Sequence, residues 1–143
     1  MNALTSLQRR PRARAVLSAG GTRIARVDGH ALSRRVALRS VPRALESRIV
    51  PAATTGLCCV YELRVTASAG GPEARFTLTV ADGAVRVEAR PAPAADAWVA
   101  LSLADMILLI SGAAGLWSLV AEHRVSLGGE IFTVMRFPGL LGF

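Results

Sequence analysis

The stretch EARFTLTVADGAVRVEAR, residues 73–90, decides how this chain folds. Apolar and polar residues alternate on both sides of Asp82-Gly83, and a period of two is that of a strand with one buried face. An Asp-Gly pair between two such runs favours a tight turn, because glycine readily adopts the positive φ that the turn requires. The stretch therefore predicts a β-hairpin.

The same alternation continues outside the hairpin. Further strands are predicted at LCCVYELRV (57–65), WVALS (98–102) and RVSL (124–127). Gly70-Gly71-Pro72 is expected to turn the first strand into the second, and Gly128-Gly129 to form a turn after the last. These segments predict an antiparallel meander with one apolar and one polar face, followed by a fourth and a fifth strand.

Helical periodicity precedes and follows the predicted strands. A pattern that begins at Leu32 places four apolar residues on one face, namely Leu38, Val41, Leu45 and Ile49. Within it, Ser40 with Pro42 suits a helix start, and Pro51 marks the end. After the sheet, Glu130 suits the start of a last helix over 131–137, and Pro138-Gly139 its end.

The segment MILLISGAAGLWSLVA, residues 106–121, has no charged residue. It could span a membrane, form a buried helical hairpin or line an apolar cavity. A spanning helix needs ~20 mostly apolar residues, whereas Gly112 and Gly115 interrupt this run. We expect a helix from Leu103, with Ser102 and Asp105 as a capping box, and a second short helix over 116–123. A helix that is apolar all round is buried or in lipid, and we favour the buried pair.

Charge is concentrated at the start of the chain. All 17 basic residues are arginine, and residues 1–48 hold eleven of them against two acids. We predict that residues 1–31 form a basic, flexible leader and that 32–143 form a single domain. The leader could contact an anionic membrane surface or nucleic acid. Since residues 1–60 contain no aromatic side chain for base stacking, no nucleic-acid partner is expected.

Motifs for catalysis or metal binding are missing from the sequence. Cys58 and Cys59 are adjacent and have no third cysteine to pair with, so a reducing, cytoplasmic compartment is expected. The only histidines, His30 and His123, lack metal-ligand spacing. We therefore predict no metal, no cofactor and no enzymatic activity. The arginine-only, alanine-rich composition is typical of a GC-rich bacterial coding sequence.

The order of the predicted elements resembles the sterol carrier protein 2 family. The resemblance rests on four segments: VYELRVTA (60–67), FTLTVADGAVRVEA (76–89), DAWVALSLADMILLISG (96–112) and HRVSLGGEIFTVMRFPGLLGF (123–143). It implies an α+β fold in which helices cover one face of a curved, mainly antiparallel five-strand sheet. It also implies non-enzymatic binding and transfer of a sterol, fatty acid or fatty acyl chain. Some members support a partner enzyme as an appended domain, so a membrane-associated or accessory role is the alternative.

The apolar helices after the sheet supply the predicted ligand site. They carry more apolar surface than one sheet face can bury, and each CH₂ of an alkyl ligand gains ~0.8 kcal/mol on burial. We predict that an apolar cavity is lined by Met106, Ile110, Leu116, Trp117, Leu119, Ile131, Met135, Leu140 and Phe143. Met106 and Met135 suit varied ligands because their side chains are flexible.

Overall fold

A computed structural model describes residues 31–67 and 72–142. Its centre is a five-stranded sheet in the order β3-β2-β1-β4-β5. The strands are β1 Cys58–Thr66, β2 Ala74–Ala81, β3 Ala84–Glu88, β4 Ala97–Ser102 and β5 Ser126–Gly129. Three pairings are antiparallel, and the central pair of β1 with β4 is parallel. The predicted mainly antiparallel five-strand sheet is confirmed, and Asp82-Gly83 joins β2 to β3.

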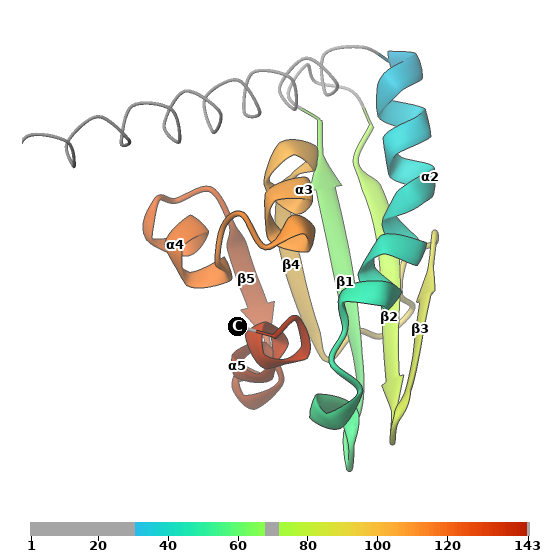
Figure 1. The fold of residues 1–143 in the computed structure, drawn as a ribbon, viewed down its shortest axis with the longest axis vertical. Helices are drawn as coiled ribbons and strands as arrows, with labels where there is room; N and C mark the ends of the chain where they lie inside the picture. Colours follow the sequence, from blue (N-terminus) through green and yellow to red (C-terminus); the bar gives the residue numbers. More distant parts are fainter. Residues whose placement is uncertain (1–30, 68–71, 143) are drawn as a thin grey trace, which may run out of the picture.

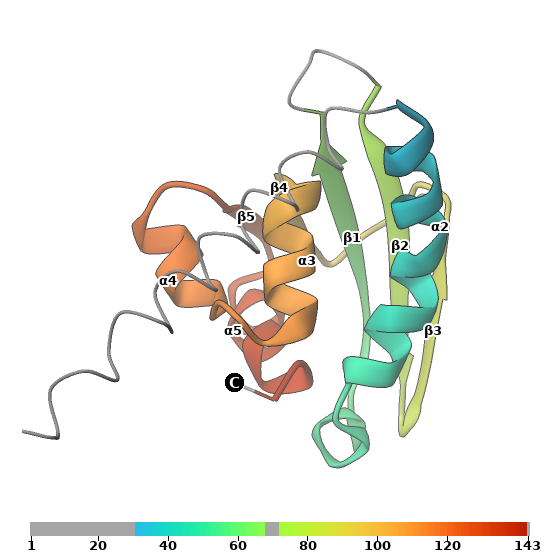
Figure 2. The ribbon, with the colours of Figure 1, turned by 45° about the horizontal axis from the view of Figure 1, so that its top comes forward.

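The helices lie on one face of this sheet (Figure 1). They are α2 Ala31–Arg48, η1 Pro51–Thr54, α3 Leu103–Ser111, α4 Leu116–Ala121 and α5 Ile131–Leu140. Figure 2 shows α2 and α3 side by side, with α2 toward β2 and β3, α3 toward β1 and β4, and α4 and α5 toward β5. The predicted α+β architecture, with helices on one face, is confirmed.

The core lies between this helical layer and the sheet. Tyr61, Leu63 and Val65 of β1 are fully buried there, as the alternation in 57–65 predicts. The rings of Tyr61 and Phe137 are 5.2 Å apart and tilted by 51°, so α5 packs directly on the central strand. Leu45 of α2 is equally buried, which confirms the predicted apolar face of the first helix.

The opposite face is not the fully polar, wet surface that the alternation predicts. Glu62 and Thr77 are buried on it, because β4 lies beyond β1 and the connector 89–96 has to cross this face to reach it. The Thr77 hydroxyl donates to the carbonyl of Arg90 at 2.8 Å. The backbone N–H of Ala92 donates to Glu62 Oε2 at 3.0 Å. The connector thus shields two polar side chains and satisfies both.

Two prolines that were expected to bound helices lie inside them. Helix α2 runs through Pro42, so Ser40 and Pro42 do not start a helix. Helix α5 includes Pro138 and Gly139 and ends at Leu140. In each case the proline removes one backbone donor, but the helix buries apolar residues on both sides of it. Tertiary burial outweighs the local penalty.

The Gly128-Gly129 pair belongs to β5 and not to a turn. A Cβ on Gly128 would lie 2.5 Å from the Trp98 ring, so the indole packs on bare backbone. Gly129 has φ +105°, and a Cβ there would lie 2.6 Å from Cα of Ala97. Close approach of β4 to β5 therefore requires both glycines. The strand also starts later than predicted, at Ser126, because the N–H of Arg124 donates to the carbonyl of Leu119 at 2.9 Å and still belongs to the end of α4.

The predicted helix termini around the uncharged segment are largely confirmed. The Ser102 hydroxyl accepts from the N–H of Asp105 at 3.1 Å and begins α3, although the Asp105 carboxylate bonds Arg124 and does not complete a capping box. Gly112 ends α3 in the left-handed conformation, φ 76°. Glu130 caps α5 by accepting from the N–H groups of Phe132 and Thr133.

One side chain of α2 reaches the free edge of the sheet. The N–H of Val87 in β3 points away from β2 and donates to Glu46 Oε1 at 3.0 Å. This contact fixes the C-terminal end of α2 over the β3 edge.

Within the part of the chain that the structure describes, no helix is both long and apolar enough to cross a bilayer. Residues 1–30 of the predicted leader, the Gly70-Gly71 turn and Phe143 lie outside the described residues.

Candidate functional site

The predicted cavity residues occupy three kinds of position. Met106, Leu116, Leu119 and Leu140 are each 1% exposed and belong to the core. Ile110 is half-buried. Trp117, Ile131 and Met135 are exposed, by 46%, 67% and 59%, and Phe143 is not described. The structure thus brings four of the nine together in the packed interior and places three on the surface.

A first hollow, here called the α2–α3 groove, lies between these two helices. Its volume is about 200 Å³. Its walls are apolar apart from two serines, and they comprise Ala37, Ser40, Val41, Ala44, Ile107, Ile110 and Ser111. The groove exists because α2 presents the small side chains of Ala37 and Ala44 to the larger Ile107 and Ile110 of α3.

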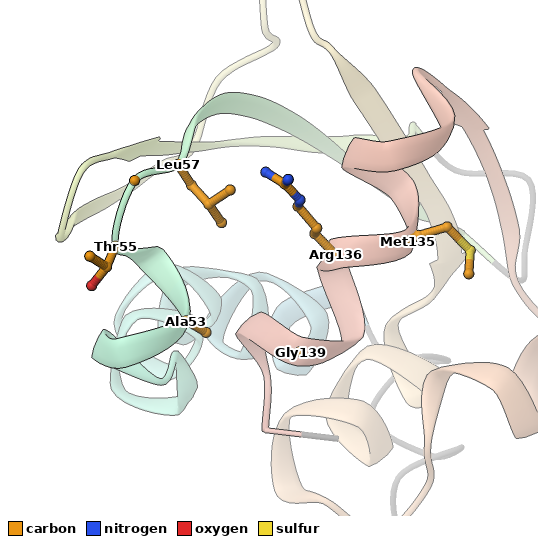
Figure 3. Close-up of a pocket in the computed structure, with 7 residues that line it drawn as sticks. Ala53, Thr55, Leu57, Met135, Arg136 and Gly139 are labelled. Atoms are coloured by element: carbon orange, nitrogen blue, oxygen red, sulfur yellow. The ribbon is translucent and has the colours of Figure 1, made fainter.

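A second hollow, the η1–α5 pocket, has a volume of about 390 Å³. It is lined by Ala53, Thr55, Gly56, Leu57, Met135, Arg136 and Gly139. Figure 3 shows Arg136 extending from α5 across this pocket toward Leu57, whereas Met135 points away from it. The pocket is bounded by apolar groups on the η1 side and by one cation on the α5 side.

Arg136 makes no hydrogen bond or ion pair with any described residue. Two carboxylates lie within electrostatic range of this region, Glu130 and Asp96. Each is hydrogen-bonded to the backbone: Glu130 caps α5, and Asp96 accepts from the N–H of Val60 at 2.7 Å. The Thr133 hydroxyl and the backbone N–H groups of Phe132 and Thr133 hold the pKa of Glu130 below its ordinary value. Among the described residues, the guanidinium therefore interacts with Glu130 only through its charge, and it faces the pocket without a hydrogen-bonded carboxylate.

Two titratable side chains of β1 that lie near Arg136, Cys59 and Tyr61, have raised pKa values. Burial raises the pKa of the Cys59 thiol, although Tyr61 and Arg136 oppose the shift. Burial and Cys59 together raise the pKa of the Tyr61 hydroxyl. Neither side chain is an activated nucleophile, since that would require a lowered pKa. Among the described residues, no three His, Cys, Asp or Glu side chains gather as a metal site.

The Tyr61 hydroxyl fastens α5 to the sheet. It donates to the carbonyl of Thr133 at 2.7 Å. We expect Tyr61→Phe to lower the free energy of unfolding by about 1 kcal/mol, the usual net contribution of one such bond. Urea denaturation followed by circular dichroism measures the change. An unaltered midpoint would show that the bond contributes nothing to stability.

Sequence patterns did not reveal Arg136 or the η1 residues as site residues. Arg136 is one polar residue in the helix predicted over 131–137. Residues 53–57 show neither helical nor strand periodicity. The small residues Ala37 and Ala44 are seven apart on one helical face, and this spacing was an available signal for the α2–α3 groove.

Solved structures show where this fold occurs. The crystal structure of sterol carrier protein 2-like 2 from Aedes aegypti has a TM-score of 0.59 at 13% identity, covering 74% of this chain and 97% of that one. The solution structure of the palmitated SCP2L2 from the same species has a TM-score of 0.58 at 11% identity, covering 75% and 92%. At such identities the likeness establishes the fold alone.

The inverting sec-alkylsulfatase Pisa1 from Pseudomonas sp. also contains this fold. The TM-score is 0.53 at 19% identity, over 65% of this chain but 14% of the sulfatase. A comparison with curated protein sequences gives no match. Residues 42–142 match the SCP-2 sterol transfer family, a family of lipid binding and transfer. Because this match covers most of the chain and the fold agrees with it, the chain belongs to the SCP-2 sterol transfer family.

Proposed function

We propose that this chain binds and carries one apolar ligand, a fatty acid, fatty acyl chain or sterol, between its sheet and its helical layer, and that it catalyses no reaction itself. Family membership supports the ligand class. The palmitated mosquito relative supports an acyl chain as a suitable occupant of the fold.

The α2–α3 groove is the observation that carries this proposal. Helix α3 is apolar on two sides: Met106 and Leu109 face the sheet, while Ile107 and Ile110 face the groove. An ordinary surface helix has one apolar stripe. The second stripe is therefore available to an apolar ligand.

Entry through the groove requires α2 and α3 to separate. Small-molecule sites usually enclose ~300–1,000 Å³, more than the 200 Å³ that the groove provides. Separation would expose Met106 on the sheet-facing side of α3, and a longer chain would continue toward Leu116, Leu119 and Leu140. In this proposal Ile110 lines the entrance of the ligand cavity. The far end of that cavity is bordered by Trp117, Ile131, Met135 and Phe143.

Filling the groove tests the proposal. We expect Ala37→Phe to weaken binding of a fluorescent fatty-acid analogue by about tenfold or more, since the ring occupies the entrance and about 1.4 kcal/mol is a factor of ten. The matched control is Ala95→Phe, because Ala95 is exposed in the connector on the opposite face. Fluorescence titration measures the affinity, and circular dichroism checks the fold. Equal affinity in both variants would exclude the groove as the entrance.

An accessory role is the second candidate. The sec-alkylsulfatase carries this fold as a small part of a longer enzyme. By analogy, the chain would hold an alkyl substrate for a partner enzyme.

A further inference from the structure

We infer that the η1–α5 pocket binds the carboxylate end of a fatty acid through Arg136. This rests on the proposed function for the acyl class of the ligand, but not on the α2–α3 groove as its entrance. It singles out ionised fatty acids among the apolar ligands that such a carrier could take.

The first support is an exposed cation that has no hydrogen-bonded carboxylate among the residues that the structure describes. Arg136 is the charged residue among those that line the pocket, and Figure 3 shows its side chain directed into the cavity. Glu130 and Asp96 already accept backbone N–H donors. A guanidinium presents paired donors that match the two oxygens of a carboxylate. An exogenous carboxylate would therefore complete the charge balance.

The second support is the shape and chemistry of the remaining walls. The volume of about 390 Å³ falls within the usual range for small-molecule sites. Leu57 and Ala53 line the pocket on the η1 side, so their apolar side chains can contact the first methylenes of a chain. At Gly139 the helix leaves open space, because a Cβ there would meet nothing within 4 Å. The pocket thus combines one cation with an apolar wall and an unfilled helix face.

The test compares dodecanoate with dodecanol, which has the same chain without a charge. Isothermal titration at about pH 8 keeps the acid ionised. We expect the wild-type chain to bind dodecanoate about tenfold more tightly than dodecanol. Arg136→Gln should remove this preference by weakening dodecanoate alone. Arg136→Lys should retain part of it, because the charge remains without the paired donors.

Two further variants sharpen the test. Arg86→Gln removes an exposed arginine of β3 that does not line the pocket, and it should keep the full preference for dodecanoate. Gly139→Leu should fill the open helix face and weaken both ligands, without the strain that would arise at a glycine of positive φ.

The outcomes separate this inference from the proposed function. Binding of dodecanol with no preference for dodecanoate, or a preference that survives in Arg136→Gln, would overturn the role of Arg136 and leave the carrier function standing. A wild-type chain that binds neither ligand would overturn both.

Discussion

Replacing Gly129 by alanine is expected to lower the free energy of unfolding by about 3 kcal/mol. The new Cβ would overlap the backbone of Asp96 and Ala97, and alanine tolerates φ +105° poorly. The carbonyl of Asp96 also accepts the N–H of Glu130 at 2.7 Å, so the start of α5 would shift together with β5. Chemical denaturation measures the loss.

Gly139→Ala is the matched control for that substitution. Gly139 lies in α5 and has free space around its Cα, so alanine should leave the chain as stable or more stable, by up to about 1 kcal/mol. Equal stability of the two variants would show that the approach of β4 to β5 is not as close as the structure indicates.

Glu62→Gln is expected to lower the free energy of unfolding by about 2–3 kcal/mol. The Glu62 carboxylate is buried under the connector, bonds Arg64 Nε at 2.6 Å and lies 3.6 Å from Arg75. Removing one member of a buried ion pair costs ~3–5 kcal/mol, and the partial exposure of both arginines reduces this. Arg64 also stacks 4.6 Å from the Trp98 ring, so its displacement would loosen β4.

Glu73→Gln provides the comparison on the same face. Glu73 is exposed and pairs with Arg75 at 3.2 Å, and exposed pairs contribute ~0–1 kcal/mol. A loss as small for Glu62→Gln as for Glu73→Gln would mean that the connector does not shield Glu62.

Acidification should reduce the contribution of Glu62. Burial alone would raise its pKa, but the bonds from Arg64 and the N–H of Ala92, with the charges of Arg64 and Arg75, hold the pKa below its ordinary value. A lowered folded-state pKa means that the ionised group stabilises the fold above the unfolded-state pKa and loses this effect as pH falls through the folded one. The stability difference between wild type and Glu62→Gln should therefore shrink in acid.

Local patterns were sufficient to predict the strands and the helices, whereas the cover of one sheet face by helices was implied by the family resemblance. The alternation around Asp82-Gly83 depends on neighbours in sequence, and so does the cap at Glu130. By contrast, the burial of Glu62 depends on the path of the connector, which follows from β4 pairing in parallel with β1. The roles of Gly128 and Gly129 depend on the approach of Trp98 and Asp96 from another strand. No local period carries such information.

The candidate site was harder to predict for the same reason. Apolar helical positions such as Met106 and Leu140 can face either a ligand or the core, and periodicity does not separate the two. Arg136 is a candidate site residue because of its spatial neighbours, which are η1 and two carboxylates that are hydrogen-bonded to the backbone. Only the folded arrangement brings these groups together.

The contact between Glu46 and Val87 also affects how copies of the chain meet. An edge strand with free N–H groups is a template for strand addition, and so for aggregation. At β3 one such donor is already taken by Glu46, and the exposed Arg86 lies beside it. A strand from a second copy would have to displace a carboxylate before it could pair. This edge is thereby protected against growth of the sheet by addition of a second copy.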